Sequence, residues 1–334
     1  MFRLLGNILS PAGERARLTI LTFHRVLAEP DPILHDVVDA STFEAHMVFL
    51  KREFNVLPLG EASARLARGG LPARAACITF DDGYANNEQV ALPILNRVGI
   101  PATFFIATGF LDGEVMFNDA VIEVIRTAPD GTHDLAALDL PAYALSDSGT
   151  RRAAIDDLIE RLKYRPLTER STLVERLAGK TGGKLPTDLM MAPAQIRRLH
   201  DRGMEIGSHT INHPILLRLD DNAARSEIVG SKRRLEEITD APVTLFAYPN
   251  GKPGTDYGPQ HVRMVRDAGF ASAVSTVSAA AEGGSDLFEL PRFSPWDRSP
   301  RRLALRLLAN CMRPVPQSTP STLQPKPKSK PAAN

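Results

Sequence analysis

Short apolar runs recur along the chain, and an amphipathic stretch follows most of them. The runs are residues 18–23, 54–57, 76–80, 102–107, 204–207, 243–247, 270–275 and 288–293. They are mostly uninterrupted by polar residues, which is typical of strands covered on both faces of a parallel sheet. The pattern therefore predicts an α/β fold. Seven or eight such units fit a closed or nearly closed barrel better than a doubly wound open sheet, although spacing alone leaves both arrangements open.

Helices are predicted between several of these runs. Ser41 and Glu44 have the spacing of a capping box, and residues 43–54 place apolar side chains at helical intervals. Three further segments have helical patterns and end beside a glycine suited to a left-handed cap. They are 89–98 with Gly99, 194–202 with Gly203 and 262–268 with Gly269.

Two segments interrupt this rhythm. Residues 109–190 contain helical candidates at 119–127, 151–164 and 169–177, and we predict that they form a helical insertion in a βα loop. Such loops lie beside barrel active sites, so we expect the insertion to act as a lid or side wall that shapes substrate choice. Residues 313–334 are rich in Pro, Ser, Thr and Lys and should form a disordered tail. The predicted division is an N-terminal segment (1–17), a catalytic domain (18–312) and this tail.

Composition excludes several classes of protein. The chain has 334 residues, 43% of them hydrophobic, with 40 Lys and Arg against 39 Asp and Glu. These values exclude disorder throughout, and a net charge of +1 argues against a nucleic-acid partner. The two cysteines, Cys77 and Cys311, exclude a disulfide framework.

Membrane and targeting signals are weak. No window of about 20 apolar residues predicts a transmembrane helix, and residues 1–10 are too short and interrupted for a secretory signal. We therefore expect a cytoplasmic protein. Phe2, Leu5 and Leu9 would form one side of a short helix, which we expect to dock on the core, with peripheral membrane contact as the alternative. The oligomeric state stays open.

Two adjacent carboxylates end the third apolar run. Asp81 and Asp82 are followed by Gly83, which lets the chain turn sharply. Neighbouring acids raise each other's pKa unless a cation or donors compensate, so the pair suggests a metal site or a catalytic role. A simple Asp-Asp-Gly turn is the structural alternative, and for the pair alone it is the favoured one.

Two histidines follow a later apolar run. His209 and His213 are four residues apart, close enough to reach one cation from a helical turn or tight loop. Together with one carboxylate they would give three ligands and leave open coordination positions, as in catalytic sites. Two surface histidines would be the favoured interpretation of this spacing alone, but the acids at a second strand end favour a site.

These residues resemble the polysaccharide deacetylase family, also called carbohydrate esterase family four. Residues 79–83, Thr-Phe-Asp-Asp-Gly, match its first motif, and residues 208–213 resemble its His-Ser/Thr-x-x-His second motif. The resemblance implies a distorted (β/α) barrel of seven or eight strands. It also implies that Asp82, His209 and His213 bind one divalent metal, usually zinc, and that Asp81 is the general base. We expect strand alternation to point the two neighbouring acids in different directions.

The third family motif, Arg-x-Pro-Tyr-Gly, is altered here. Ala247 occupies the place of the arginine that orients the base, and Asn250 occupies the place of the tyrosine whose backbone N–H binds the oxyanion. The N–H donor does not depend on the side chain, so we assign Asn250, with Tyr248, to the oxyanion and substrate site. Arg292 is the candidate for the missing cation, and a surface or fold-stabilising arginine is the equally weighted alternative.

The family's late Leu-x-His motif is not visible in the C-terminal third. Instead, His24 ends the first apolar run, which resembles the branch that deacetylates poly-N-acetylglucosamine. We assign His24 as the general acid, with a purely structural role as the alternative. Trp296 is a candidate sugar-stacking residue, and closing the end of the barrel is its alternative role.

Three functions follow from the resemblance. The favoured one is a metal-dependent hydrolase that removes N-acetyl groups from a polysaccharide, an oligosaccharide or a lipid-linked glycan containing amino sugars. Hydrolysis of another non-peptide C–N bond, in a small or cyclic amide, is the alternative. An inactive carbohydrate-binding module comes third, because the base and all three ligand positions are filled.

Overall fold

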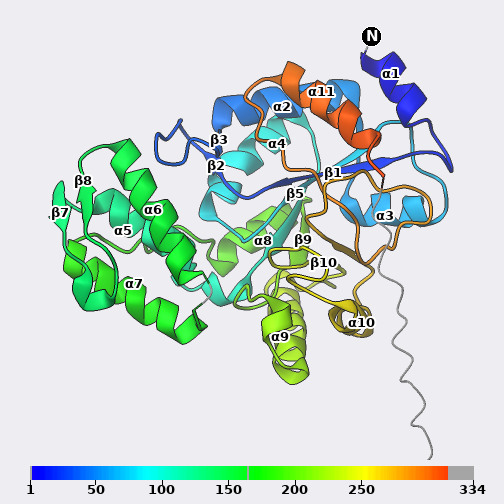
Figure 1. Ribbon diagram of the computed structural model, residues 1–334. Helices are drawn as coiled ribbons and strands as arrows, with labels where there is room; N and C mark the ends of the chain where they lie inside the picture. The colour runs from blue at the N-terminus through cyan, green and yellow to red at the C-terminus, as the bar shows by residue number, and fades with distance from the viewer. Residues whose placement is uncertain (1, 164, 315–334) are drawn as a thin grey trace, which may run out of the picture.

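A curled sheet of parallel strands forms the centre of the molecule (Figure 1). The structure is a computed structural model that describes residues 2–163 and 165–314. The strand order is β1-β5-β6-β9-β10-β11, and β4 also pairs with β5. The bounds are β1 Leu18–Phe23, β4 Asn55–Val56, β5 Ala75–Phe80, β6 Thr103–Ile106, β9 Glu205–Ser208, β10 Leu245–Ala247 and β11 Ser272–Val274. Seven of the predicted runs thus form strands of one sheet.

The eighth run, 288–293, joins the two edges of the sheet without forming a strand. The N–H of Leu290 donates to Ala273 O (2.9 Å), in β11, and the N–H of Phe293 donates to Ile20 O (2.7 Å), in β1. Pro291 lies between these two contacts and has no N–H to donate, so a continuous ladder cannot form. Single bridges therefore close the sheet, and the predicted (β/α) barrel is confirmed in a distorted form.

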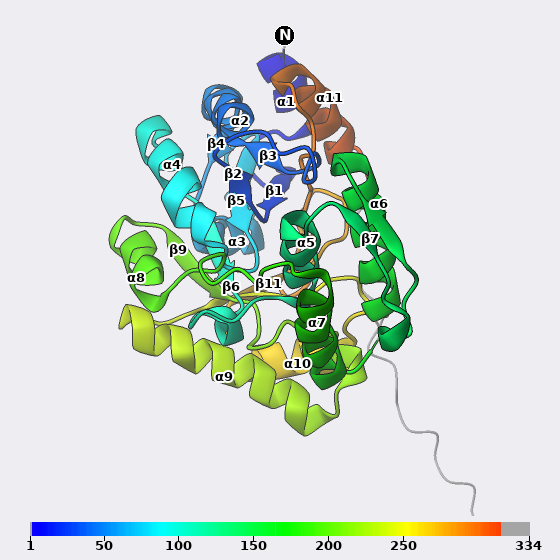
Figure 2. The same cartoon turned by 90° about the vertical axis from the view of Figure 1, so that its left-hand side faces the viewer.

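Alternate residues of each strand face opposite sides of the sheet. Side chains such as Ile20, Cys77 and Phe105 pack together in one buried cluster with helix α3 (Leu59–Ala67). Their neighbours, such as Leu21 and Phe104, pack in a second cluster with the outer helices. Those helices are α2 Ala40–Glu53, α4 Leu92–Val98, α8 Pro193–Asp201, α9 Asp221–Thr239, α10 Pro259–Asp267 and α11 Pro300–Cys311. Figure 2 shows α2, α4, α8 and α9 following one another around the outside of the sheet.

Helix ends agree with the predicted glycine stops but not with the predicted cap. Gly99, Gly203 and Gly269 have φ values of 70°, 80° and 79°, in the left-handed region. The capping box at Ser41 and Glu44 was wrong, because Asp39 caps α2 by accepting a hydrogen bond from Thr42 N. An aspartate caps the N-terminus of a helix as well as a serine does, and Asp39 lies two residues before Ser41.

The insertion is a helical unit with its own core. It contains α5 (Phe117–Thr127), α6 (Ser148–Leu162) and α7 (Leu167–Thr181). The predicted helices 119–127 and 169–177 lie within α5 and α7, and α6 covers the predicted helix 151–164 as far as Leu162. A short hairpin, β7 (Gly131–His133) and β8 (Tyr143–Leu145), was not predicted. The helices bury a separate apolar cluster that includes Val121, Leu158 and Leu177. The insertion lies to one side of the sheet in Figure 1.

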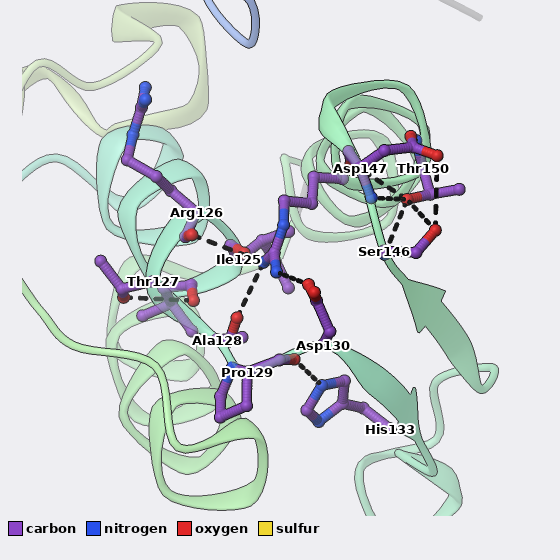
Figure 3. Close-up of polar contacts among 12 residues, drawn as sticks. Ile125, Arg126, Thr127, Ala128, Pro129, Asp130, His133, Ser146, Asp147 and Thr150 are labelled. Atoms are coloured by element: carbon purple, nitrogen blue, oxygen red, sulfur yellow. Dashed lines mark hydrogen bonds and ion pairs between the residues drawn. The ribbon is translucent and has the colours of Figure 1, made fainter.

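Polar contacts fix the turn between α5 and the hairpin (Figure 3). Arg151 donates to the carbonyl oxygens of Ile125 (2.5 Å) and Ala128 (2.9 Å) and to Asp130 Oδ1 (2.6 Å). These acceptors include C-terminal carbonyls of α5, which have no partner within the helix. The guanidinium of α6 therefore joins the two helices at this end.

The N-terminal segment forms helix α1 (Phe2–Leu9). Phe2 packs against Phe49 and Phe54, as expected for docking on the core, whereas Leu4 and Ile8 are exposed. In the part of the chain that the structure describes, no helix has the length and apolar character needed to cross a bilayer. The predicted tail lies outside the described residues from 315 onward, so the division into three segments stays a prediction.

Candidate active site

The predicted site residues meet where the parallel strands end. A cavity of about 400 Å³ opens there, between the strand ends and helix α5. Its lining includes His24 after β1, Asp81 and Asp82 after β5, and His209 and His213 after β9. The carboxyl ends of parallel strands converge on one face of such a barrel, which is why residues distant in sequence share this cavity.

Asp82, His209 and His213 form a cluster with the spacing of a metal site. Asp82 Oδ1 lies 3.5 Å from Nε2 of both histidines. The potential ligand atoms of the three residues all lie within 4.8 Å of one another. Asp82 Oδ1 is buried and has no hydrogen-bond partner. A buried carboxylate oxygen without a donor is costly, so this donor set fits a cation such as Zn²⁺.

The two imidazoles are arranged as ligands. The Nδ1–H of His209 donates to Ala247 O at 2.7 Å, which leaves the lone pair of Nε2 directed to the cluster. Burial lowers the pKa of His213 to about 4, so its ring is neutral at pH 7. Burial would also lower the pKa of His209, but the carboxylates of Asp82 and Asp81 raise it overall. The cluster therefore attracts positive charge.

Left-handed backbone conformations concentrate around this cluster. Asp82, Thr210, His213 and Asn250 have φ values of 76°, 66°, 52° and 59°. Such values are uncommon outside glycine and are strained for a β-branched residue such as threonine. Asp81 and Asp82 both lie beyond the end of β5 at Phe80. The left-handed turn at Asp82, and not the expected strand alternation alone, therefore separates the two carboxylates.

Glu227 of α9 holds the loop that carries the histidines. Its Oε2 accepts hydrogen bonds from the N–H groups of Ile211 and Asn212, both at 2.8 Å, and its Oε1 accepts from Asn212 Nδ2 at 2.7 Å. Sequence analysis missed this residue, because an acid on an amphipathic helix is typical of a solvated face. The contact fixes the loop between His209 and His213.

Asp81 forms a buried ion pair with Arg292. Arg292 donates from Nη1 to Asp81 Oδ1 (2.7 Å) and from Nη2 to Oδ2 (2.6 Å), and its Nε donates to Ser275 O. Burial alone would raise the pKa of Asp81, but the charge of Arg292 lowers it below the usual value. The carboxylate is therefore ionised and fixed in orientation at neutral pH.

Comparison with known proteins identifies the family. Residues 68–273 match the model of the family described as polysaccharide deacetylase, which is more than half of the chain. The chain belongs to the polysaccharide deacetylase family. It is therefore a deacetylase-type hydrolase that acts on carbon–nitrogen bonds, as predicted.

Individual relatives of this deacetylase are distant. It is 23% identical over 279 residues to YxkH of Bacillus subtilis (strain 168), which is described as a polysaccharide deacetylase; the match covers 83% of this chain and 71% of YxkH. It is 31% identical over 138 residues to a poly-β-1,6-N-acetyl-D-glucosamine N-deacetylase of Staphylococcus aureus. That match covers 38% of this chain and 48% of the staphylococcal protein, about half of its length.

A solved structure supports the fold. The Streptococcus pyogenes deacetylase PplD, in complex with acetate, superposes with a TM-score of 0.59. The two share 18% sequence identity over 87% of this chain and 97% of PplD. At this identity the likeness shows the fold alone.

Three other predicted residues of the deacetylase lie at the same cavity. His24 is exposed at the lining, and its carbonyl oxygen accepts a hydrogen bond from Asn87 Nδ2 at 2.8 Å. Asn250 also lines the cavity, and its N–H donates to no described residue. Tyr248 contributes to the wall but is fully buried and stacks on Tyr257, with ring centroids 3.8 Å apart. The roles assigned to all three stay predictions.

Trp296 is not brought together with these residues. It is 65% exposed and is not part of the cavity lining of the deacetylase. Arg306 of α11 lies 4.0 Å above its ring and also donates to Asp297 Oδ2 (2.6 Å). The ring therefore packs against Arg306 of α11, and the role of Trp296 stays a prediction.

Sequence analysis also missed a polar group at the cavity. Tyr84 donates to Asp119 Oδ2 at 2.8 Å, and Arg25 Nη1 lies 3.7 Å from Asp119 Oδ1. Burial raises the pKa of Asp119 to about 6, although the charge of Arg25 opposes this rise. Arg25 and Asp119 belong to a loop and to the first turn of α5, where charged residues are ordinary. The positions of Arg25 and Asp119 in the sequence therefore did not indicate that the two residues meet.

Proposed function

We propose that this chain is a metal-dependent enzyme that removes N-acetyl groups from an amino sugar in a polysaccharide, an oligosaccharide or a lipid-linked glycan. One observation carries the proposal. The cluster of Asp82, His209 and His213 faces the same cavity as Asp81, whose carboxylate is fixed by Arg292. The staphylococcal relative, whose printed name includes poly-β-1,6-N-acetyl-D-glucosamine, supports the choice of an N-acetylated glycan.

The residues of the site divide the reaction between them. A divalent ion, which we expect to be zinc, would act as a Lewis acid on the acetyl carbonyl when bound by Asp82, His209 and His213. Asp81, ionised because of Arg292, accepts the proton of the attacking water. The N–H of Asn250 is free to donate to the developing oxyanion.

His24 completes the proposed reaction. An amine is a poor leaving group unless it is protonated, so an acid must lie at the cavity. His24 is the exposed imidazole in the lining, whereas His209 and His213 lie beside Asp82.

The shape of the site favours a glycan over a small amide. The cavity continues into a second one of about 620 Å³, and Asp82 and His213 line both. A small amide would leave most of this space empty, whereas a glycan substrate has further groups that can extend along it. The filled base and ligand positions argue against the inactive carbohydrate-binding module.

Metal content and acetate release test the proposal. The purified protein is stripped with a chelator, reloaded with Zn²⁺ and assayed on partially acetylated poly-β-1,6-glucosamine, chitooligosaccharides and small acetamides. We expect glycan turnover that disappears on chelation and returns with the metal. His213→Ala should lose both metal and turnover, and His200→Ala on α8 is the matched control. Turnover of small acetamides alone would contradict a glycan substrate and favour the alternative, hydrolysis of a small or cyclic amide. A His213→Ala protein with a full metal equivalent would overturn the metal site.

A further inference from the structure

A second cavity lies between the insertion and the loops that carry the metal cluster. Its volume is about 620 Å³, and it is lined by residues of α5, α6 and α7 on one side and by residues 212–219 on the other. Asp82, His213, Asn118 and Asn250 line both this cavity and the one described above. A substrate with its amide at the cluster therefore has space to extend into the second cavity.

The second cavity carries an excess of positive charge. Lys163, Arg165, Arg170 and Arg218 contribute to its lining. Among the described lining residues, Asp82 of the metal cluster is the one carboxylate. An occupant that carries negative charge would therefore be favoured at the side of the cavity away from Asp82.

Arg170 is positioned to bind an anion. Its guanidinium lies 4.4 Å from the centre of the Phe117 ring, and its buried Nε has no hydrogen-bond partner. Burial lowers the pKa of Arg170, which reflects the cost of a charge withdrawn from water. Arg218, across the cavity, is exposed and forms no ion pair with any described residue. Two guanidinium groups with donors to spare suit the oxygens of a phosphate.

Much of the rest of the lining is apolar, beside the polar side chains of Asn118, Ser171, Asn212, His213 and Asn250. Phe110, Val115, Met116, Phe117, Ile159 and Leu219 all contribute side chains. Sugar hydroxyl groups that face these apolar side chains would lose hydrogen bonds that they make with water. An aliphatic chain would instead be stabilised by removal from water. A uronic acid is disfavoured as the anionic group for the same reason, because the sugar ring that carries its carboxylate would place hydroxyl groups against these apolar side chains.

We propose that the second cavity binds a phosphodiester and the aliphatic chain attached to it, so that the substrate is an acetylated amino sugar linked through phosphate to a lipid. This inference rests on the proposed function, and it selects the lipid-linked glycan from the three substrate classes named there. Arg170 and Arg218 bind the phosphate, and the apolar walls hold the first part of the chain.

Three synthetic substrates separate the contributions of phosphate and chain. They are N-acetylglucosamine 1-phosphate, octyl N-acetylglucosaminide, and the phosphodiester of N-acetylglucosamine 1-phosphate with octanol. Acetate release is measured with the full-length, zinc-loaded protein. We expect kcat/KM for the octyl phosphodiester to exceed that for each of the other two by about tenfold or more, the effect of a charged hydrogen bond or of several buried methylene groups.

Variants test whether the named arginines cause this preference. Arg170→Gln and Arg218→Gln should each reduce kcat/KM for the octyl phosphodiester by about tenfold more than they reduce kcat/KM for the octyl glycoside. Arg170→Lys should keep part of the preference, because it retains the charge but loses the planar fork. Arg263→Gln, an exposed position on α10, is the matched control. Circular dichroism and thermal melting check that each variant is folded.

Calorimetry with octyl phosphate, which has no amide, separates this proposal from the function. Binding that is weakened in Arg170→Gln supports the cavity assignment even if no substrate releases acetate, a result that would contradict the deacetylase proposal alone. Acetate release without phosphodiester preference and without octyl phosphate binding would overturn the cavity assignment and leave the deacetylase proposal intact. Absence of both binding and acetate release would overturn both.

Discussion

Arg292 donates to both carboxylate oxygens of Asp81, at 2.7 and 2.6 Å, from a position 211 residues away in sequence. Both side chains are buried, with exposed fractions of 0% and 3%. Ala247 has no charge to offer Asp81. Arg292 reaches Asp81 from the segment that joins the edges of the sheet. The positive charge beside Asp81 thus comes from position 292 and not from position 247, where the family motif has its arginine.

Arg292→Lys should shift the acid limb of the pH profile. The charge of Arg292 lowers the pKa of Asp81, and a lysine lacks the planar fork that donates to the two oxygens in parallel. The pKa of Asp81 therefore rises in the variant, so the base is protonated at a higher pH. We expect the acid limb of kcat/KM to move to higher pH and turnover to fall about 10- to 100-fold. Arg306→Lys is the control, and an unchanged limb in Arg292→Lys would contradict the orienting role.

Asp81→Asn and Asp82→Asn should have different effects on metal content. Asp82 belongs to the ligand cluster, whereas Asp81 is paired with Arg292. We expect Asp81→Asn to retain the metal and to lose about 10²–10⁴-fold in turnover, as for loss of a positioned base. Asp82→Asn should lose the metal. Elemental analysis beside acetate assays measures both, and metal loss in Asp81→Asn would make Asp81 a ligand instead.

His24→Gln tests the general acid. The variant should fold and bind metal, because the side chain is exposed and the loop is anchored through its backbone carbonyl. Turnover should fall by about 10²–10⁴-fold. His200→Gln on α8 provides the matched control. Normal turnover with a lowered melting temperature would favour the structural role.

Asp39→Ala should destabilise the protein by about 1 kcal/mol at pH 7, because it removes the cap of α2. Burial alone would raise the pKa of Asp39, but hydrogen bonds from Ser41 and Thr42 lower it from 3.8 to about 2. The stabilisation is therefore present above pH 4 and is lost as the pH falls toward 2. Urea unfolding across this range measures the difference, and Asp188→Ala, an exposed position, is the control. Equal stability of wild type and variant at pH 7 would refute the cap.

The strands were predictable because their apolar runs are uninterrupted. The cluster of Asp82, His209 and His213 was predictable because its three residues occur in two short motifs. The helices of the insertion followed from their periodicity. The cap of α2 was not predictable, because Asp39 and Ser41 are both favourable at that position and tertiary packing chooses between them.

Contacts between distant segments account for the remaining omissions. Glu227 acts on the histidine loop from a helix whose pattern gives no sign of it. The group of Arg25, Tyr84 and Asp119 forms only where α5 of the insertion meets the loop after β1. Each residue alone has an ordinary place in its own element, so a linear pattern contains no trace of the pairing.

The segment that joins β11 to β1 has one more consequence. Leu290 and Phe293 each make two backbone hydrogen bonds across it, whereas β1 and β5 pair along their whole length of six residues. Local opening would therefore begin at this joint, and amide hydrogens there should exchange with solvent before those of β1 and β5. Arg292 lies between the two contacts. Opening of the joint would withdraw the guanidinium from Asp81 while Asp82, His209 and His213 stayed in place. The proposed proton acceptance by Asp81 should therefore fail before the proposed metal binding as the temperature rises.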